Sequence, residues 1–257
     1  MRANYHTHTP RCNHAQGREE AYILRALEAG FEELGFSDHS PYFFDRPGYY
    51  SSFRMRPEQL EDYVSTLLEL REQYRDRIRL HIGLETEYYP KTFPKLLDFF
   101  KEFPLDYLLL GQHALCNETE GIYSTQPTDD PKRLDRYLGQ TLEALDTGCF
   151  SCFAHPDILF FTGDRKRYEA HVRALCRGAM DRGIPLEFNL LGFREGKHYP
   201  NLIFWQIAGE EGCPAVLGSD AHEPAATWDP FLVQKAETFL GARQVRILDR
   251  LFLRKPN

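Results

Sequence analysis

Residues 57–85 read PEQLEDYVSTLLELREQYRDRIRLHIGLE, an amphipathic segment followed directly by a short apolar one. Apolar side chains recur about every 3.6 residues between Leu60 and Leu70, and Pro57 suits the first turn of a helix. The next seven residues are rich in leucine and isoleucine, as strands often are, and end at Glu85. This stretch therefore predicts one helix over 57–77 and one strand over 79–85.

The same alternation of short apolar and longer amphipathic segments runs through the chain. Strands are predicted at 3–8, 33–38, 79–85, 106–112, 151–155, 185–189 and 215–219. Helices are predicted at 18–30, 57–77, 92–103, 132–147, 167–182, 201–212 and 230–241. No low-complexity stretch or Ser/Gly-rich linker divides the sequence, so we expect a single domain over 1–257. Seven such units predict an α/β fold with a parallel sheet.

Composition excludes several classes of protein. Hydrophobic residues make up 42% and charged residues 27%, which is ordinary for a globular domain and argues against disorder or a fibrous repeat. The net charge is −7 and no basic block occurs, so we expect no nucleic-acid or membrane partner. The apolar runs are too short to span a bilayer, and Asn4, His6 and His8 interrupt any secretory core. We therefore expect a cytoplasmic protein.

The six cysteines do not resemble a disulfide framework in a chain of this length, and a cytoplasmic location would keep them reduced. Cys149 and Cys152 have CxxC spacing. A structural zinc site needs a second such pair, which the chain lacks, so we interpret both as core thiols.

Histidine, aspartate and glutamate recur where the predicted strands end. These positions are His6 and His8, Asp38 and His39, Glu85, His113, His155, and Asp220 with His222. In barrels of the TIM type, functional side chains lie at the C-terminal ends of the strands and meet around one mouth. An open sheet would instead spread them along an edge. We therefore expect a closed or distorted barrel of the TIM type, built from the seven units.

The residue types at these strand ends are those of a metal centre. Imidazole and carboxylate suit zinc, iron, manganese or nickel, and no thiolate joins the pattern. The nine candidate ligands are His6, His8, His14, His39, Glu85, His113, His155, Asp220 and His222. Nine exceed the needs of one ion, so we expect two or three divalent metal ions (zinc, iron or manganese) that share a bridging carboxylate. With only two anionic ligands the centre would be cationic, which suits a small-molecule phosphate monoester.

Other residues near these positions have different interpretations. Asp38 is expected to orient a neighbouring imidazole, and Glu87 to be structural or to support a ligand. His81 and His171 lie away from the pattern and are expected on the surface of a strand and a helix.

These motifs resemble the PHP superfamily, named for polymerase and histidinol phosphatase. The resemblance covers residues 6–222 and rests on six segments: His6-Thr7-His8-Thr9 with His14, Ser37-Asp38-His39-Ser40, Gly83-Leu84-Glu85, Gly111-Gln112-His113, Ala154-His155-Pro156-Asp157 and Gly218-Ser219-Asp220-Ala221-His222. Two further segments resemble the histidinol-phosphate phosphatase branch: Phe53-Arg54-Met55-Arg56-Pro57-Glu58, and Leu186-Glu187-Phe188-Asn189 with Gly192-Phe193-Arg194.

The resemblance implies a trinuclear metal centre in a distorted (β/α)7 barrel. The implied ligand sets are His6, His8, Glu85 and Asp220 for the first ion, bridging Glu85 with His113 and His155 for the second, and His14, His39 and His222 for the third. The implied reaction is hydrolysis of L-histidinol phosphate to L-histidinol and phosphate, a step of histidine biosynthesis. Its hypothesised nucleophile is a metal-bridging hydroxide that Glu85 and Asp220 help to position.

Basic side chains are expected to bind the phosphate. Arg194 resembles an arginine of the family, and a guanidinium fork matches a phosphate better than an ammonium does. Lys197, His198 and Arg165 are further candidates. Phe160-Phe161 stands where better-known relatives carry basic residues, so part of substrate recognition differs.

Several alternatives stay open at this point. The aromatic-rich stretch 42–50 either forms a wall of the pocket or covers apolar barrel surface. The substrate could be another small phosphate monoester or a nucleotide. A PHP-like binding module would be expected to lack ligands, and none is missing. A dinuclear amidohydrolase would need a metal-bridging lysine at a later strand end, and none stands there. The sequence does not determine the oligomeric state.

Overall fold

The strands of the barrel follow one another in sequence order. A computed structural model describes residues 1–256. The strands are β1 (Ala3–Asn4), β2 (Glu33–His39), β3 (Arg79–Thr86), β4 (Tyr107–Leu110), β5 (Phe150–Phe153), β6 (Leu186–Asn189) and β7 (Ala215–Gly218). They form one sheet in the order β1-β2-β3-β4-β5-β6-β7, and every neighbouring pair is parallel.

The two edges of this sheet meet just beyond β1 and β7. Thr7 pairs with Ala221 in parallel, and the backbone N–H of His8 donates to the Ala221 carbonyl at 2.9 Å. The sheet therefore curls into a nearly closed barrel, which confirms the predicted distorted (β/α)7 TIM-like fold.

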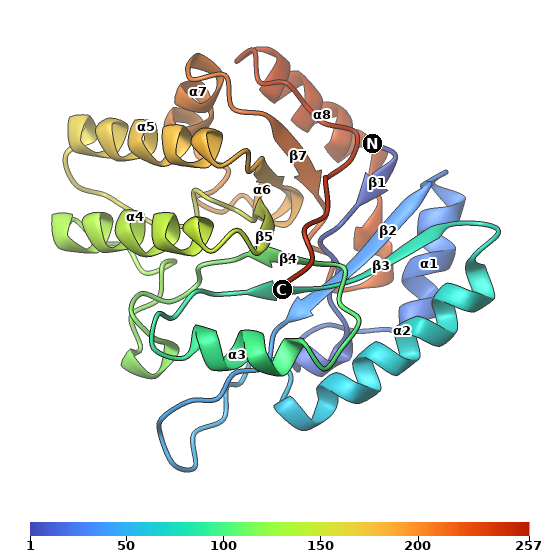
Figure 1. Ribbon diagram of the computed structural model, residues 1–257. Helices are drawn as coiled ribbons and strands as arrows, with labels where there is room; N and C mark the ends of the chain where they lie inside the picture. The colour runs from blue at the N-terminus through green and yellow to red at the C-terminus, as the bar shows by residue number, and fades with distance from the viewer. Residues whose placement is uncertain (257) are drawn as a thin grey trace.

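The helices surround the barrel on its outside (Figure 1). Their bounds are α1 (Glu19–Glu28), α2 (Leu60–Tyr74), α3 (Phe93–Phe100), α4 (Pro131–Asp146), α5 (Arg165–Asp181), α6 (Leu190–Glu195), α7 (Leu202–Glu210) and α8 (Pro230–Gly241). The side chains of Asp130, Asp164 and Asp229 accept backbone N–H groups at the starts of α4, α5 and α8. These caps satisfy donors that would otherwise have no partner, which is why the helices begin there.

Helix α6 was not predicted. It has six residues, too few to show a 3.6-residue period, and begins directly after β6. The Asn189 side chain accepts the N–H of Gly192 at 2.8 Å and so starts the helix without a loop.

The predicted first strand, 3–8, is only two residues long. Beyond these two residues, the Asn4 side chain forms hydrogen bonds with the backbone in place of strand pairing. Its Oδ1 accepts the N–H of Ser219 at 2.9 Å, and its Nδ2 donates to the His6 carbonyl at 3.2 Å. A side-chain amide thus links the ends of the sheet where the backbone ladder is interrupted.

The barrel interior is apolar at the N-terminal end of the strands. A separate buried cluster there consists of Ala3, Tyr5, Tyr107, Leu109, Cys152, Ala154, Val216 and Leu251. The C-terminal segment, red in Figure 1, crosses this end: Leu248 N–H donates to the Ala215 carbonyl at 2.7 Å, and Arg254 N–H to Ser151 Oγ at 2.8 Å. This end is closed, so the functional groups lie at the other end.

Some sequence-based expectations about single residues are settled by burial. Cys149 and Cys152 are buried and unpaired, as expected of core thiols. The prediction that His171 lies on the surface is wrong, since it is 7% exposed in α5 and lies beside Tyr137 and Tyr168. His81 is half-buried, and its Nε2 lies 2.9 Å from Glu33 Oε2. Within residues 1–256, none of the helices combines the length and hydropathy that a membrane crossing requires.

Candidate metal centre

The nine predicted ligands gather at the C-terminal end of the barrel. A cavity of about 270 Å³ opens there, and seven of the nine line it: His14, His39, Glu85, His113, His155, Asp220 and His222. The remaining two, His6 and His8, are fully buried and contact the same carboxylates. The structure thus brings together groups that are more than 200 residues apart in the sequence.

Glu85 joins two groups of imidazoles. Its Oε1 lies 2.7 Å from His155 Nε2 and 3.4 Å from His113 Nε2. Its Oε2 lies 3.1 Å from His39 Nδ1 and 3.4 Å from His6 Nε2. A carboxylate that divides its oxygens in this way has the geometry of a bridging ligand.

Asp220 provides the second carboxylate. Its Oδ1 lies 3.1 Å from His8 Nε2, 3.5 Å from His6 Nε2 and 3.4 Å from His222 Nδ1. His14 completes this side, since its ring centroid is 4.5 Å from that of His222.

Three further carboxylates contact the Nδ1 atoms of three imidazoles, on the side of each ring that faces away from the cavity. His6 Nδ1 lies 2.7 Å from Glu187 Oε2, His8 Nδ1 3.3 Å from Asp38 Oδ1, and His113 Nδ1 3.0 Å from Glu87 Oε1. If each Nδ1 carries the proton, it donates a hydrogen bond to the carboxylate. The Nε2 atom then has a free lone pair, which faces the cavity. Asp38 and Glu87 therefore contact predicted ligands, His8 and His113, as expected.

The role of Glu187 was missed by sequence reasoning. It alternates with Asn189 on β6, so both face the barrel interior, and the Asn189 amide donates to Glu187 Oε1 at 2.8 Å and to Asp220 Oδ2 at 3.0 Å. That period-two spacing was the available signal.

Several buried polar atoms facing the cavity lack a hydrogen-bond partner within residues 1–256. They are Glu85 Oε2, Asp220 Oδ1, His39 Nδ1 and His222 Nε2. In addition, His6 Nε2 and His8 Nε2 lie 3.1 Å apart although carboxylates contact the Nδ1 atoms of both rings. Two facing lone pairs repel, and unpaired buried acceptors are costly, unless a cation lies between them. These residues therefore fit divalent metal ions.

The pKa shifts in the ion-free protein show that the cavity favours positive charge. Burial alone would lower the pKa of His6 and His8, but nearby carboxylates hold it well above its usual value. Burial alone would raise the pKa of Glu85, but nearby His113, His39 and His6 hold it well below its usual value. Burial likewise opposes the low pKa of Asp220, which results mainly from His6 and His8. Burial lowers the pKa of His222 to about 3, so this imidazole stays neutral and able to bind a metal.

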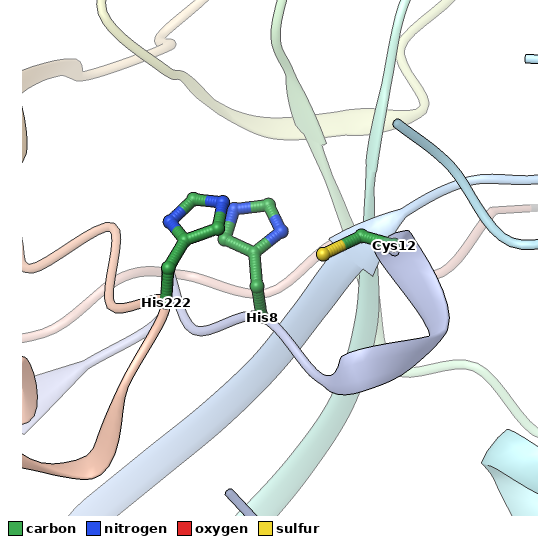
Figure 2. Close-up of side chains that lie close together, drawn as sticks. All are labelled: His8, Cys12 and His222. Atoms are coloured by element: carbon green, nitrogen blue, oxygen red, sulfur yellow. The ribbon is translucent and has the colours of Figure 1, made fainter. Parts of the chain in front are cut away.

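Cys12 is a further residue of the site. Its sulfur is buried and lies within 4.8 Å of ligand nitrogens of both His8 and His222. Figure 2 shows it beside the His8 ring, with His222 on the other side of that ring. The Cys12 carbonyl accepts from His14 Nδ1 at 2.8 Å. Cys12 does not stand at a strand end, but the turn after β1 places its sulfur beside two predicted ligands.

The backbone at two ligands is in the left-handed region. His155 has φ of 31° and Asp220 φ of 46°, conformations that are unfavourable for residues with a Cβ and that cluster at functional sites. The glycines at strand ends serve a different purpose. A Cβ at Gly111 would overlap the Glu85 carboxylate, and one at Gly218 would overlap that of Glu187. Both glycines make room for the carboxylates.

The predicted substrate contacts lie in different places. Lys197 lines the cavity together with Phe53, Tyr123 and Tyr199. Arg194 is exposed on α6, and Arg165 is exposed and paired with Glu169 at 2.7 Å. His198 Nε2 contacts the Ile158 carbonyl at 2.7 Å while its ring stacks on Phe160 at 4.2 Å. The structure does not bring these three to the lining, and their roles stay predictions.

The aromatic stretch 42–50 does not line this cavity. Tyr42 is buried, and its ring centroid lies 4.9 Å from that of Tyr89. This position favours the interpretation that the stretch covers the barrel, while Phe53, just beyond it, forms part of the pocket wall.

Comparisons with known proteins identify relatives along nearly the whole chain. The PHP domain profile matches residues 4–190. A probable histidinol-phosphatase of Deinococcus radiodurans is 30% identical over 230 residues, which cover 85% of this chain and 85% of that protein. The histidinol-phosphatase of Bacillus subtilis is 26% identical over 251 residues, 85% of this chain and 92% of its own.

A solved structure has the same fold. It is a histidinol phosphate phosphatase from Lactococcus lactis, complexed with zinc, L-histidinol and phosphate. It matches with a TM-score of 0.72 at 20% identity and covers 96% of this chain and 95% of its own.

Proposed function

This chain belongs to the PHP domain family, and we propose that it is a metal-dependent phosphatase that hydrolyses L-histidinol phosphate to L-histidinol and phosphate, a step of histidine biosynthesis. The names of the curated relatives support the substrate, since they are similar over 85% or more of this chain. We further propose that residues 1–257 act as one domain in the cytoplasm on a small molecule, without nucleic acid or membrane as partner.

One observation carries the metal dependence. Buried oxygens of Glu85 and Asp220 have no hydrogen-bond partner although imidazoles surround them. We propose two or three divalent ions, of zinc, iron or manganese, held by the nine residues His6, His8, His14, His39, Glu85, His113, His155, Asp220 and His222. When bound, such ions would neutralise phosphate charge and make a water molecule nucleophilic at neutral pH.

Other residues of the chain would orient the metal ligands and bind the substrate. Glu187, Asp38 and Glu87 hold three imidazoles with their Nε2 atoms inward. Lys197 brings a positive charge to the cavity wall, where it can bind a phosphate oxygen, and Arg194 is proposed to reach the same group from α6. The Phe53 and Tyr123 rings line the remaining wall and offer apolar faces to the imidazole of the substrate.

The alternative substrate class is another small phosphate monoester or a nucleotide. The cavity volume of about 270 Å³ lies just below the usual range for ligand pockets, and this favours a small ester over a nucleotide.

The function is tested with the protein purified with its metals. Metal content is measured first, and phosphate release from L-histidinol phosphate is then compared with release from p-nitrophenyl phosphate and a panel of other monoesters. We expect kcat/KM for L-histidinol phosphate to exceed that for p-nitrophenyl phosphate by about a hundredfold or more. Equal values would show that the assigned substrate is wrong, although the hydrolase class would stand.

A further inference from the structure

A buried arginine lies next to the metal centre, outside the predicted ligand set. Arg54 is 2% exposed, and its guanidinium contacts two buried carboxylates. Its Nη1 and Nη2 donate to Glu87 Oε2 and Oε1, both at 2.8 Å. Its Nε donates to Glu118 Oε2, also at 2.8 Å. The Arg54 guanidinium therefore forms ion pairs with two buried carboxylates, those of Glu87 and Glu118.

Glu87 connects this arginine to a predicted metal ligand. The Glu87 Oε1 atom that accepts from Arg54 also lies 3.0 Å from His113 Nδ1. On the other side of the ring, His113 Nε2 lies 3.4 Å from Glu85 Oε1. The bidentate contact fixes the plane of the Glu87 carboxylate, and with it the proton and orientation of the His113 ring.

The same guanidinium also supports the pocket wall. Its carbon lies 4.6 Å from the ring centroid of Phe53, and Phe53 lines the cavity with its centroid 5.5 Å from that of His39. Through Glu118, whose Oε1 accepts from Tyr49 at 2.7 Å, Arg54 also holds the aromatic stretch 42–50. One buried side chain thus contacts Phe53 of the cavity wall and, through Glu87, is connected to His113.

We propose that Arg54 is a positioning residue that couples the metal centre to the substrate-facing wall: its fork orients Glu87, and through it His113, while its face supports Phe53. The proposal rests on the proposed metal centre but not on the identity of the substrate. A lysine could not replace Arg54, because an ammonium is a point charge without the planar fork that both carboxylates share.

The two carboxylates allow a matched comparison. In Glu87→Gln or Glu118→Gln, Arg54 keeps one buried carboxylate, so in both variants the pair is balanced in charge and we expect folding. Glu87→Gln should weaken binding of one metal ion by about ten- to a hundredfold, the usual effect of losing a carboxylate behind a ligand histidine. Glu118→Gln should leave metal affinity unchanged, because it keeps the bidentate contact of Arg54 with Glu87. It should raise KM, because it removes the carboxylate that holds the Nε side of the guanidinium stacked on Phe53.

Arg54 itself is tested with Arg54→Lys and Arg54→Met, and Arg56→Met serves as the control because Arg56 is exposed and stacks on Tyr50. Metal-free protein is titrated with zinc, metal per chain is measured by elemental mass spectrometry, and cobalt-loaded protein is examined by visible absorption. We expect Arg54→Lys to fold, to bind one ion about tenfold or more weakly, to change the cobalt spectrum and to have raised KM and lowered kcat. Arg56→Met should match the wild type.

Two results would overturn the proposal. The first is an Arg54→Lys protein with unchanged metal titration and cobalt spectrum, which would make Arg54 a purely structural clamp. The second is equal loss of metal in Glu87→Gln and Glu118→Gln, which would point to general destabilisation. If Arg54→Met does not fold, the metal titrations of Arg54→Lys, Glu87→Gln and Glu118→Gln still test the proposal. Because the metal titration uses no substrate, it decides this proposal even if L-histidinol phosphate is not hydrolysed.

Discussion

Glu85, the last but one residue of β3, has one carboxylate oxygen facing His113 and His155 and the other facing His6, His8 and His39. Gly111, which directly follows the neighbouring strand β4, leaves space for the carboxylate. At the scale of single residues, the proposed metal centre therefore depends on a carboxylate placed between two sets of imidazoles.

Replacing this charge tests the ligand assignment directly. Glu85→Gln should strip metal and lower kcat/KM by more than about a hundredfold, since an amide oxygen bridges two cations poorly. Elemental analysis and phosphate release measure both effects. The control is Glu69→Gln, which makes the same charge change on the exposed face of α2. A Glu85→Gln protein with full activity and full metal content would refute the assignment.

The phosphate contacts are tested by removing one positive charge at a time. Lys197→Ala and Arg194→Ala should each raise KM about tenfold or more without changing metal content, because a charge-assisted hydrogen bond contributes about 1.5–3 kcal/mol. Steady-state kinetics checks this against Arg167→Ala, an exposed arginine that pairs with Asp135 at 2.7 Å. An unchanged KM in both variants would show that neither Lys197 nor Arg194 binds the phosphate.

At the scale of elements, helix α5 carries an unusual buried histidine. His171 has its ring between Tyr137 of α4 and Tyr168 of α5, with centroid distances of 6.1 and 6.2 Å, and its Nδ1 has no partner among the described residues. Burial lowers its pKa to about 4. The folded protein therefore favours the neutral ring, while the unfolded chain takes up a proton near pH 6.5.

This shift predicts how stability depends on pH. A depressed histidine pKa contributes stability above pH 6.5 that is lost as the pH falls toward 4, so the free energy of unfolding should drop by about 2 kcal/mol between pH 7.5 and 5 from this group. His171→Phe should remove that part of the drop. Urea unfolding of both metal-free proteins at the two pH values measures the difference. Equal drops in the two proteins would contradict the burial argument.

At the scale of the whole molecule, the two ends of the barrel differ: one holds the candidate site and the other is covered by the C-terminal segment. The C-terminal strand ends hold the polar site, whereas the C-terminal segment closes the opposite end. Leu251 in this segment is 8% exposed and packs in the cluster with Tyr5 and Tyr107, but the next residue, Phe252, is 83% exposed.

This separation predicts that the closed end contributes to stability without affecting metal binding. Leu251→Ala should lower the free energy of unfolding by about 2–3 kcal/mol, and Phe252→Ala by less than about 0.5 kcal/mol. Both proteins should bind the same metal as the wild type. Urea unfolding with metal analysis checks this; a loss of metal in Leu251→Ala at temperatures where it is folded would show that the two ends are coupled.

Much of this protein follows from local sequence. The helix pattern at 57–77 and the apolar strands reflect burial of neighbouring residues, which is a short-range property, so the seven α/β units were predicted to within a few residues at most boundaries. Because parallel strands of a barrel end at one mouth, residues at strand ends could be predicted to meet. The eight predicted ligands at strand ends do meet, and His14 from the loop after β1 joins them.

The rest was decided by tertiary structure. The contacts of Glu187 with His6 and of Arg54 with Glu87 join different segments of the chain, and no local pattern encodes such neighbours. The same holds for the burial of His171, which depends on α4 packing against α5. The sequence by itself determined which chemical groups stand at the strand ends, since that depends only on order along the chain. Only the closed barrel decided which of them touch, because contact depends on how the sheet curls and where each side chain then points.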